Sequence, residues 1–462
     1  MATFVRRGLF RGRLEEVFAW HERPGAFARL NPPWEPVKVL RSDNSIRDGA
    51  RVTISVPAGP GPLRHLRLPW TVEHRDYIEH RQFRDVQVHG PFAKWEHTHR
   101  FESAGGEETI LEDRIEYALP LPLAAGTGVV RRKLGRLFTY RHAILAQDLA
   151  LFAALPAARP LTVLVSGATG LVGQALEALL TVAGHRVIRL GRAGGADTIR
   201  WDPLRGEIEL PKSIRLDAVV HLAGENIAGG TWSGARKERI RRSRVEGTRL
   251  LVAALKELPE RPTRFISASA VGFYGSRGDE VLTEASTPGT GFLAGVTQEW
   301  EAEARAAEAA GMTWCSLRFG VILSPLGGAL GKMLPAFLAG AGGPLGAGEQ
   351  YMSWISLDDA LGAIYRALID PRCTGVINVT APTPVTNAEF TSTLGRVLRR
   401  PTFLRVPATA LKALLGELAE EALLASTRAV PERLSGLGHT FFHPELEGAL
   451  RHILGRAPAE SS

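Results

Sequence analysis

The spacing of apolar positions changes near residue 160. Before that point, Ala50–Val56, Arg84–His89, Trp95–Phe101 and Thr109–Tyr117 alternate apolar and polar side chains or are rich in β-formers, which predicts strands. Residues 126–153 instead repeat apolar positions at helical spacing, which predicts one long amphipathic helix. A short helix, several strands and a long closing helix predict an α+β helix-grip domain, in which a curved sheet folds around the helix and leaves a cavity.

After residue 160 short apolar strands alternate with helices. The alanine- and proline-rich stretch Ala153–Pro160 is typical of a linker. The strands that we expect are Thr162–Ser166, Arg186–Leu190, Ala218–His221, Arg264–Ser267 and Thr313–Leu317. Such alternation predicts a doubly wound parallel sheet of the Rossmann type, with helices on both faces. From about residue 400 the pattern is mostly helical, with Leu411–Leu424 strongly amphipathic. We therefore expect domains at 1–153, 162–400 and 401–462, with a linker at 154–161.

Composition excludes several classes of protein. The 462 residues carry a net charge of +8, and the surplus lies mainly in residues 1–160, with 24 basic against 18 acidic side chains. The compact basic cluster Arg131–Lys133 has no interleaved aromatic residues, so we expect a solvated helix face and no nucleic-acid partner. Two cysteines cannot form a disulfide framework. No apolar run is long enough to span a bilayer, and the N-terminus lacks a signal-peptide pattern, so we expect a cytoplasmic protein.

A glycine-rich turn follows the first strand of the second half. Gly167, Gly170 and Gly173 have the GxxGxxG spacing of short-chain dehydrogenases, between a predicted strand and a predicted helix. Glycines there permit a tight turn, close approach of a pyrophosphate and tight packing of the helix on the strand. The pyrophosphate would then meet unpaired N–H groups at a helix N-terminus. We predict a dinucleotide site formed by Gly167, Thr169, Gly170, Leu171, Val172 and Gly173.

The end of the second strand predicts which dinucleotide binds. An NAD site usually has an acidic residue there, which accepts a hydrogen bond from the ribose 2′-OH. This chain has Leu190-Gly191-Arg192 instead, and the guanidinium of Arg192 suits a 2′-phosphate. We therefore expect NADP, with Arg192 as either the phosphate contact or an ordinary surface arginine. Asp202 is either a contact to the adenine amine or a turn residue.

Several longer runs resemble a known family. They are DAVVHLAGENIAG from Asp217, SRVEGT from Ser243, ISASAVGFYG from Ile266, RGDEVLTE from Arg277, MSWISLDD from Met352 and TAPTPVTNAEF from Thr380. On these runs, residues 162–455 resemble the atypical extended short-chain dehydrogenases known as epimerase-family, or NAD-dependent epimerase/dehydratase-like, proteins. The resemblance implies NADP binding, cofactor contacts from Leu222, Ala223 and Gly224, and a substrate cleft under the C-terminal subdomain.

The usual catalytic pair of that superfamily is missing. Its members use a YxxxK motif, in which the tyrosine transfers a proton and the lysine lowers the pKa of the tyrosine. None of the six tyrosines here has a lysine four residues later, and alignment places Leu293 and Thr297 at those positions. The candidate catalytic residues that remain are Ser269, Tyr274 and Glu225. Tyr274 is either a proton donor or a packed aromatic, and Glu225 is either a general base or a hydrogen-bonding residue.

The N-terminal half resembles the START-like polyketide cyclase and ligand-binding superfamily. The matching runs are RPGAFARLNPPWEPV from Arg23, DGARV from Asp48 and GPFAKWEHTHRF from Gly90. The resemblance implies a pocket for a hydrophobic ligand. His97 and His99 are two residues apart on a predicted strand and therefore face one side. We find no third metal ligand, so we expect these histidines to line or rim an apolar pocket and expect no metal.

Three functions are compatible with these features. The first is an NADP-dependent oxidoreductase or epimerase-like enzyme acting on a small molecule. The second is a non-catalytic NADP-binding sensor or scaffold that lacks YxxxK. In the third, the primary function is the binding of a lipid-like ligand in a pocket of the N-terminal domain. A homodimer is possible, because relatives pair through helices flanking the fifth strand, but Leu293–Ala307 could equally pack internally.

Overall fold

A computed structural model describes residues 1–35, 37–57, 66–121, 126–195 and 197–456 in two compact units. Met1–Pro156 make up most of the first unit, and His185–Ile453 make up most of the second. Pro36 of the expected N-terminal domain and residues 457–462 of the expected C-terminal subdomain lie outside the described residues. No helix in the described ranges is long and apolar enough to cross a membrane.

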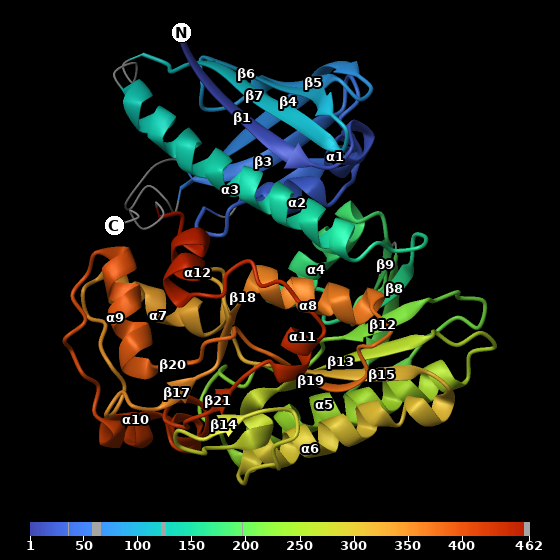
Figure 1. The fold of residues 1–462 in the computed structure, drawn as a ribbon, viewed down its shortest axis with the longest axis vertical. Helices are drawn as coiled ribbons and strands as arrows, with labels where there is room; N and C mark the ends of the chain where they lie inside the picture. The colour runs from blue at the N-terminus through green and yellow to red at the C-terminus, as the bar shows by residue number, and fades with distance from the viewer. Residues whose placement is uncertain (36, 58–65, 122–125, 196, 457–462) are drawn as a thin grey trace. The chain divides into compact units, whose positions relative to one another are not determined.

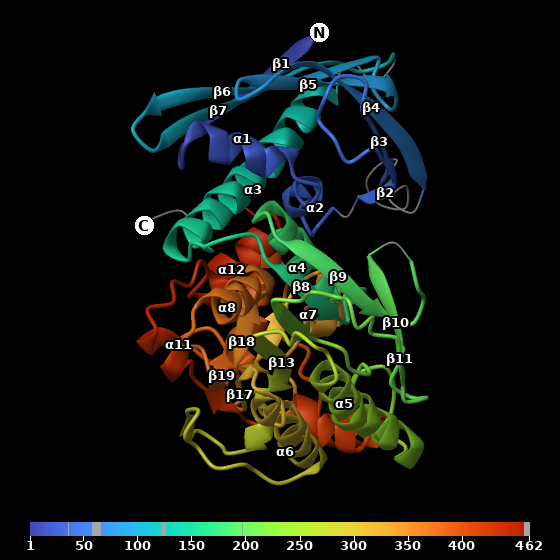
Figure 2. The same cartoon turned by 90° about the vertical axis from the view of Figure 1, so that its right-hand side faces the viewer.

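The first unit is a seven-stranded antiparallel sheet with one long helix across a face (Figures 1 and 2). The strand order is β1-β7-β6-β5-β4-β3-β2. Its elements are β1 (Ala2–Arg11), α1 (Leu14–Glu22), α2 (Ala26–Leu30), β2 (Lys38–Ser42), β3 (Arg51–Pro57), β4 (Arg67–Ile78), β5 (Gln82–His89), β6 (Lys94–Gly105), β7 (Glu108–Ala118) and α3 (Thr127–Ala154). The predicted helix-grip arrangement of a sheet with one long helix is confirmed, whereas the pocket between them that includes His99 and Phe138 has a volume of only about 10 Å³. Strands β1, β2 and β4 were not predicted. β1 pairs with β7 along its whole length.

The second unit contains an eight-stranded sheet in the order β11-β10-β9-β8-β12-β13-β15-β19. All its strands are parallel except β11, and α5 and α6 cover one face while α4 and α8 lie over the other (Figure 1). The strands are β8 (Thr162–Ser166), β9 (Arg186–Gly191), β10 (Thr198–Asp202), β11 (Glu207–Ile208), β12 (Ala218–His221), β13 (Arg264–Ala270), β15 (Thr313–Phe319) and β19 (Gly375–Val379). The helices are α4 (Leu171–Val182), α5 (Gly234–Lys256), α6 (Phe292–Arg305) and α8 (Leu357–Ile369). The predicted doubly wound Rossmann sheet is confirmed.

Apolar strands explain why this sheet is buried on both faces. Burial removes apolar surface from water, and strands covered by helices on both sides are nearly continuous hydrophobic runs. β8 and β12 fit that pattern, because Val163, Leu164, Val219 and Val220 are fully buried. The two cysteines, Cys315 and Cys373, are unpaired and buried, as expected of small core residues.

The C-terminal part is built from short elements around α7 (Gly328–Leu338) and α9 (Asn387–Leu398). The others are β14 (Val281–Leu282), β16 (Val321–Leu323), β17 (Tyr351–Met352), β18 (Trp354–Ser356), β20 (Val385–Thr386), α10 (Ala408–Leu415), β21 (Arg428–Ala429), α11 (Glu432–Gly436) and α12 (Leu446–Ile453). The amphipathic run Leu411–Leu424 is not one helix. α10 ends at Gly416, which has φ +58, and a π-helical turn follows at Ala419–Leu423. Glycine adopts this left-handed conformation without the clash that a Cβ would cause, so it ends the helix there.

Candidate cofactor and active site

The glycine turn joins β8 to α4 and has no room for side chains at two of its positions. Gly167 has φ +69, and a Cβ there would lie 2.9 Å from the backbone nitrogen of Ala223. A Cβ on Gly173 would lie only 2.2 Å from the Gly167 carbonyl oxygen. Thr169 and Gly170 are exposed at the outer side of the turn. Leu171 and Val172 form the first turn of α4. This is the backbone shape that a strand–turn–helix phosphate cradle requires.

A buried hydrogen-bond chain fixes the end of β8 to the end of β12. The Ser166 hydroxyl oxygen accepts hydrogen bonds from the N–H groups of Leu222 (3.0 Å) and Ala223 (3.2 Å). Its own proton therefore goes to Nδ1 of His221, 2.6 Å away, and Nε2 of His221 donates to Thr248 at 3.0 Å. Burial, together with Arg244, lowers the pKa of His221 to about 4, so this imidazole is neutral at physiological pH.

The strand order reverses between β8 and β12, and the loop after β8 therefore lies beside the loop after β12. β9 lies next to β8 on one side, and β13 lies next to β12 on the other. Ligands of open α/β sheets bind at the carboxyl ends of the strands where the order reverses. Leu222, Ala223 and Gly224 follow β12 at this point, and the Arg244 guanidinium packs on Gly224. Arg244 also donates to the carbonyl oxygen of Glu225 at 3.0 Å, which holds the loop in place.

Arg192 directly follows β9, and Asp202 is the last residue of the neighbouring strand β10, so both lie at the carboxyl edge of the sheet. Arg192 is exposed, and it makes no hydrogen bond or ion pair with any other described residue. Asp202 ends β10, and its carboxylate accepts a hydrogen bond from the N–H of Leu204 at 3.0 Å, so it stabilises a turn. Arg205 lies 3.8 Å from the other carboxylate oxygen of Asp202. The guanidinium of Arg192 is thus available to a ligand, and Asp202 has a structural task of its own.

Ser269 and Tyr274 belong to one buried polar network. Ser269 donates to Oε1 of Glu301 at 2.5 Å, and Arg318 binds both carboxylate oxygens of Glu301 at 2.7 Å. The Tyr274 hydroxyl accepts from Arg318 at 2.9 Å and donates to Asn378 at 2.8 Å. Tyr274 is fully buried, and burial raises the pKa of its hydroxyl. Both hydroxyls are therefore directed at protein groups.

Glu225 lies apart from that network, on the loop after β12. Its N–H donates to the Ser243 hydroxyl at 3.0 Å, and its carbonyl accepts from Arg244, so its backbone is fixed. Its side chain is 39% exposed and lies 3.7 Å from the Arg236 guanidinium. Of the three predicted catalytic side chains, Glu225 is the one that solvent reaches readily.

The helix α6 carries the positions where tyrosine and lysine stand in related enzymes. Thr297 is buried and donates its hydroxyl to the Leu293 carbonyl of the preceding turn. The first N–H groups of α6, those of Phe292 and Leu293, donate to the two carboxylate oxygens of Glu421 at 2.7 and 2.8 Å. Glu421 therefore caps α6 from the C-terminal part of the chain, a contact with no local sequence signal.

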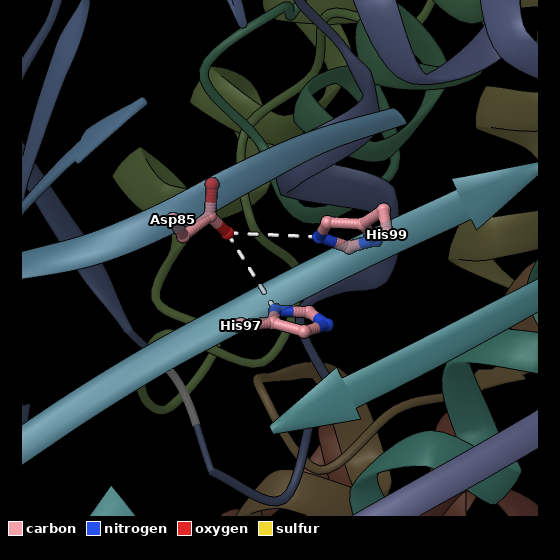
Figure 3. Close-up of side chains that lie close together, drawn as sticks. All are labelled: Asp85, His97 and His99. Atoms are coloured by element: carbon pink, nitrogen blue, oxygen red, sulfur yellow. Dashed lines mark ion pairs between the residues drawn. The ribbon is translucent and has the colours of Figure 1, made fainter. Parts of the chain in front are cut away.

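In the first unit, His99 lines a small pocket with Leu111 and Phe138, as expected, and its ring stacks on Phe83 with 4.2 Å between the centroids. His97 and His99 also belong to a charged cluster. His97 donates to Asp113 at 2.9 Å, and His99 lies 2.9 Å from the same carboxylate oxygen. Figure 3 shows that both imidazoles also face Asp85 on the neighbouring strand. Sequence reasoning missed Asp85 and Asp113, although Asp85 shares the inward face of β5 with Phe83, two residues earlier.

Comparison with known proteins assigns the second unit to a class. The fold and the glycine turn define a Rossmann protein of the epimerase type, and the model of the NAD dependent epimerase/dehydratase family matches residues 163–379. The polyketide cyclase / dehydrase and lipid transport model matches residues 13–138, and a domain of unknown function matches residues 406–453. An epimerase family protein of Mycobacterium bovis is 43% identical over 296 residues, which are 64% of this chain and 98% of that protein. The chain therefore belongs to the NAD dependent epimerase/dehydratase family.

Two solved structures extend this comparison. A nucleoside-diphosphate sugar epimerase from Corynebacterium glutamicum is 34% identical, with a TM-score of 0.78, and the match covers 98% of this chain and 90% of that one. The human epimerase family protein SDR39U1, whose structure was determined with NADPH, is 33% identical with a TM-score of 0.58. That second match covers 63% of this chain and 99% of the human chain. The first match therefore extends beyond the epimerase domain into the N-terminal one.

Proposed function

We propose that this protein binds NADP at the carboxyl end of its parallel sheet and acts on a small molecule as an oxidoreductase or epimerase-like enzyme. The observation that carries the proposal is the glycine turn, where side chains are excluded at Gly167 and Gly173 by backbone atoms 2.9 and 2.2 Å away. The NADPH in the structure of the human relative supports the same cofactor. When bound, a nicotinamide dinucleotide supplies hydride transfer.

Each part of the cofactor has candidate partners in this chain. Gly167, Thr169, Gly170, Leu171, Val172 and Gly173 would hold the pyrophosphate through backbone N–H groups at the start of α4. Arg192 would bind the 2′-phosphate, because its guanidinium is exposed and has no partner among the described residues. Asp202 would contact the adenine amine through Oδ2, since its Oδ1 accepts from the N–H of Leu204. Leu222, Ala223 and Gly224 would contact the cofactor from the loop after β12.

Titration of the purified full chain with NADPH and NADH tests this assignment. Arg192→Gln should weaken NADPH binding roughly tenfold to a hundredfold, since a hydrogen bond to a charged group contributes about 1.5–3 kcal/mol. NADH binding should hardly change. Arg215→Gln is a matched control, because it removes the same charge from an exposed arginine just before β12, at the amino edge of the sheet. Equal affinity of the wild type for both cofactors would contradict the role of Arg192.

For the chemical step, we infer that Glu225 is the side chain able to meet a substrate. Ser269 and Tyr274 use their hydroxyls within a buried network, so we assign them to bracing the sheet. Exchange of labelled hydride between NADPH and a metabolite pool should be detectable in the wild type and lost in Glu225→Gln. Glu246→Gln, on α5, is the matched control. Exchange that survives in Glu225→Gln but not in Tyr274→Phe would contradict this assignment.

The second candidate is a sensor or scaffold that binds NADP without turnover. This function is favoured by the presence of Leu293 and Thr297 at the tyrosine and lysine positions of the YxxxK motif. Neither side chain can replace the tyrosine or the lysine in acid–base catalysis. Tight NADPH binding without hydride exchange in any pool would support this function instead.

A further inference from the structure

The interior of the first unit holds acidic and imidazole side chains in two cross-strand rows. Strand pairing places His74, Asp85 and His97 directly opposite one another on β4, β5 and β6. The next row pairs His99 with Asp113 across β6 and β7. Residues opposite one another in an antiparallel sheet project to the same face, so the ladder itself gathers these groups.

Three of these side chains, Asp85, His97 and His99, each direct one possible metal-ligand atom toward a common point. Oδ2 of Asp85 lies 3.6 Å from Nδ1 of His97 and 3.6 Å from Nε2 of His99 (Figure 3). These separations are too long for hydrogen bonds. They are close to the spacing of about 3.4 Å between two donors that each lie 2.0–2.2 Å from one tetrahedral metal ion. The three donor atoms all lie within 4.8 Å of one another.

Asp113 determines which nitrogen of each imidazole faces that point. Nε2 of His97 and Nε2 of His142 form hydrogen bonds to the two carboxylate oxygens of Asp113, at 2.9 and 2.7 Å. An ionised carboxylate only accepts, and therefore the proton of His97 lies on Nε2, toward Asp113. Nδ1 of His99 lies 2.9 Å from the same oxygen. The opposite nitrogens, Nδ1 of His97 and Nε2 of His99, then face Asp85.

The surrounding groups have the arrangement of an outer shell. In metal sites, ligating imidazoles usually donate their second nitrogen to a carboxylate, which orients the rings. Asp113 takes that place for His97, its Oδ1 also lies 2.9 Å from Nδ1 of His99, and His142 on α3 holds its other oxygen at 2.7 Å. His74 lies 2.7 Å from Oδ1 of Asp85, which leaves Oδ2 for the common point.

We propose that Asp85 Oδ2, His97 Nδ1 and His99 Nε2 bind one divalent transition-metal ion inside the N-terminal domain. Two imidazoles and one carboxylate favour an ion such as Zn²⁺ or Fe²⁺ over Mg²⁺ or Ca²⁺, which prefer all-oxygen sites. Three protein ligands leave a coordination position for water or for an oxygen atom of a ligand. The Asp85 side chain is 20% exposed, against 4% for His97, so the ion would enter from the Asp85 side.

Direct metal titration of the full-length chain tests the proposal. After treatment with a chelator, the protein is titrated with Zn²⁺ by calorimetry and with Co²⁺ by visible absorption, and metal content is measured by mass spectrometry. We expect one ion per chain, with micromolar or tighter affinity and a Co²⁺ spectrum of low coordination number. His97→Gln and His99→Gln should each abolish stoichiometric binding. His89→Gln is the matched control, because His89 is an exposed histidine at the end of the strand that carries Asp85.

Asp113→Asn separates the outer shell from the ligands. It should weaken binding roughly tenfold to a hundredfold, as loss of an outer-shell partner does, while the stoichiometry stays at one. Circular dichroism of each variant shows whether the domain is folded. The proposal is overturned if the folded wild type binds neither ion in the micromolar range. Protons on the imidazoles would then be sufficient to compensate the negative charge of Asp85 and Asp113. It is also overturned if His89→Gln lowers the stoichiometry as much as the ligand variants do.

Discussion

The buried pair of Glu301 and Arg318 gives the sharpest test of how the epimerase domain is held together. The Arg318 and Glu301 side chains are 4% and 10% exposed, and two contacts of 2.7 Å join them. Glu301→Gln keeps the shape of the side chain but leaves a buried guanidinium without its anion. Removing one partner of a buried ion pair costs about 3–5 kcal/mol of stability. We expect a loss near the lower end, because the Arg318 guanidinium also lies 3.4 Å from the centre of the Phe273 ring.

The matched control lies two residues along the same helix. Glu303 pairs with Arg249, which is 60% exposed, and Glu303→Gln should cost about 0–1 kcal/mol, as exposed ion pairs do. Urea denaturation gives the overall change, and hydrogen exchange of peptides from α6 and β15 gives the local one without assuming a two-state transition for a chain of two units. A second comparison uses Arg318→Met. The double variant with Glu301→Gln should be less damaging than the sum of the singles, because neither charge is left alone. If Glu301→Gln costs no more than Glu303→Gln, the reasoning about the buried pair is wrong.

Two further predictions concern His221 and Glu421. The pKa of His221 is about 4 in the folded protein and near 6.5 in an unfolded chain. The free energy of unfolding should therefore be constant above pH 6.5 as far as His221 is concerned, and it should fall as the pH drops from 6.5 toward 4. The loss should reach about 3 kcal/mol, and urea denaturation between pH 7.5 and 4.5 should show a flatter profile for His221→Gln than for the wild type. Glu421→Ala should lower the free energy of unfolding by about 1–2 kcal/mol, because α6 loses the acceptor of its first N–H groups. Glu420→Ala is the control and should change it little, because it removes only an exposed ion pair with Lys412. Faster hydrogen exchange in the first turn of α6 would check the first substitution, and equal effects of the two would contradict the capping role.

The sequence predicts well what local patterns encode. β8 and β12 have the predicted bounds, because a short apolar run between turn residues identifies a strand that is buried on both faces. The glycine turn was predictable for the same reason, since its spacing belongs to one strand–helix unit. The end of α10 at Gly416 was missed because the helical spacing of apolar residues continues across it, whereas the helical backbone conformation does not.

Contacts between distant segments were not predictable from one sequence. Glu301 meets Arg318 only because α6 packs on β13 and β15, and no period in the sequence encodes that packing. The imidazole cluster depends on strand register, and the pairing of β4 with β5 shifts between Thr71 and Val72 and between Arg75 and Ile78. An irregular ladder moves every later side chain relative to its partner, so Asp85 could not be placed opposite His97 in advance.

The capping of α6 by Glu421 has a consequence for synthesis of the chain. The carboxylate that completes the helix is translated 129 residues after Phe292, and β21 pairs in parallel with β14 across a similar interval. Until the last segment leaves the ribosome, the first turn of α6 has no acceptor, and β14 lacks its neighbour. The nucleotide-binding half can therefore reach its final stability only after nearly the whole polypeptide has been made, and a chain that stops after α9 would have both features unfinished.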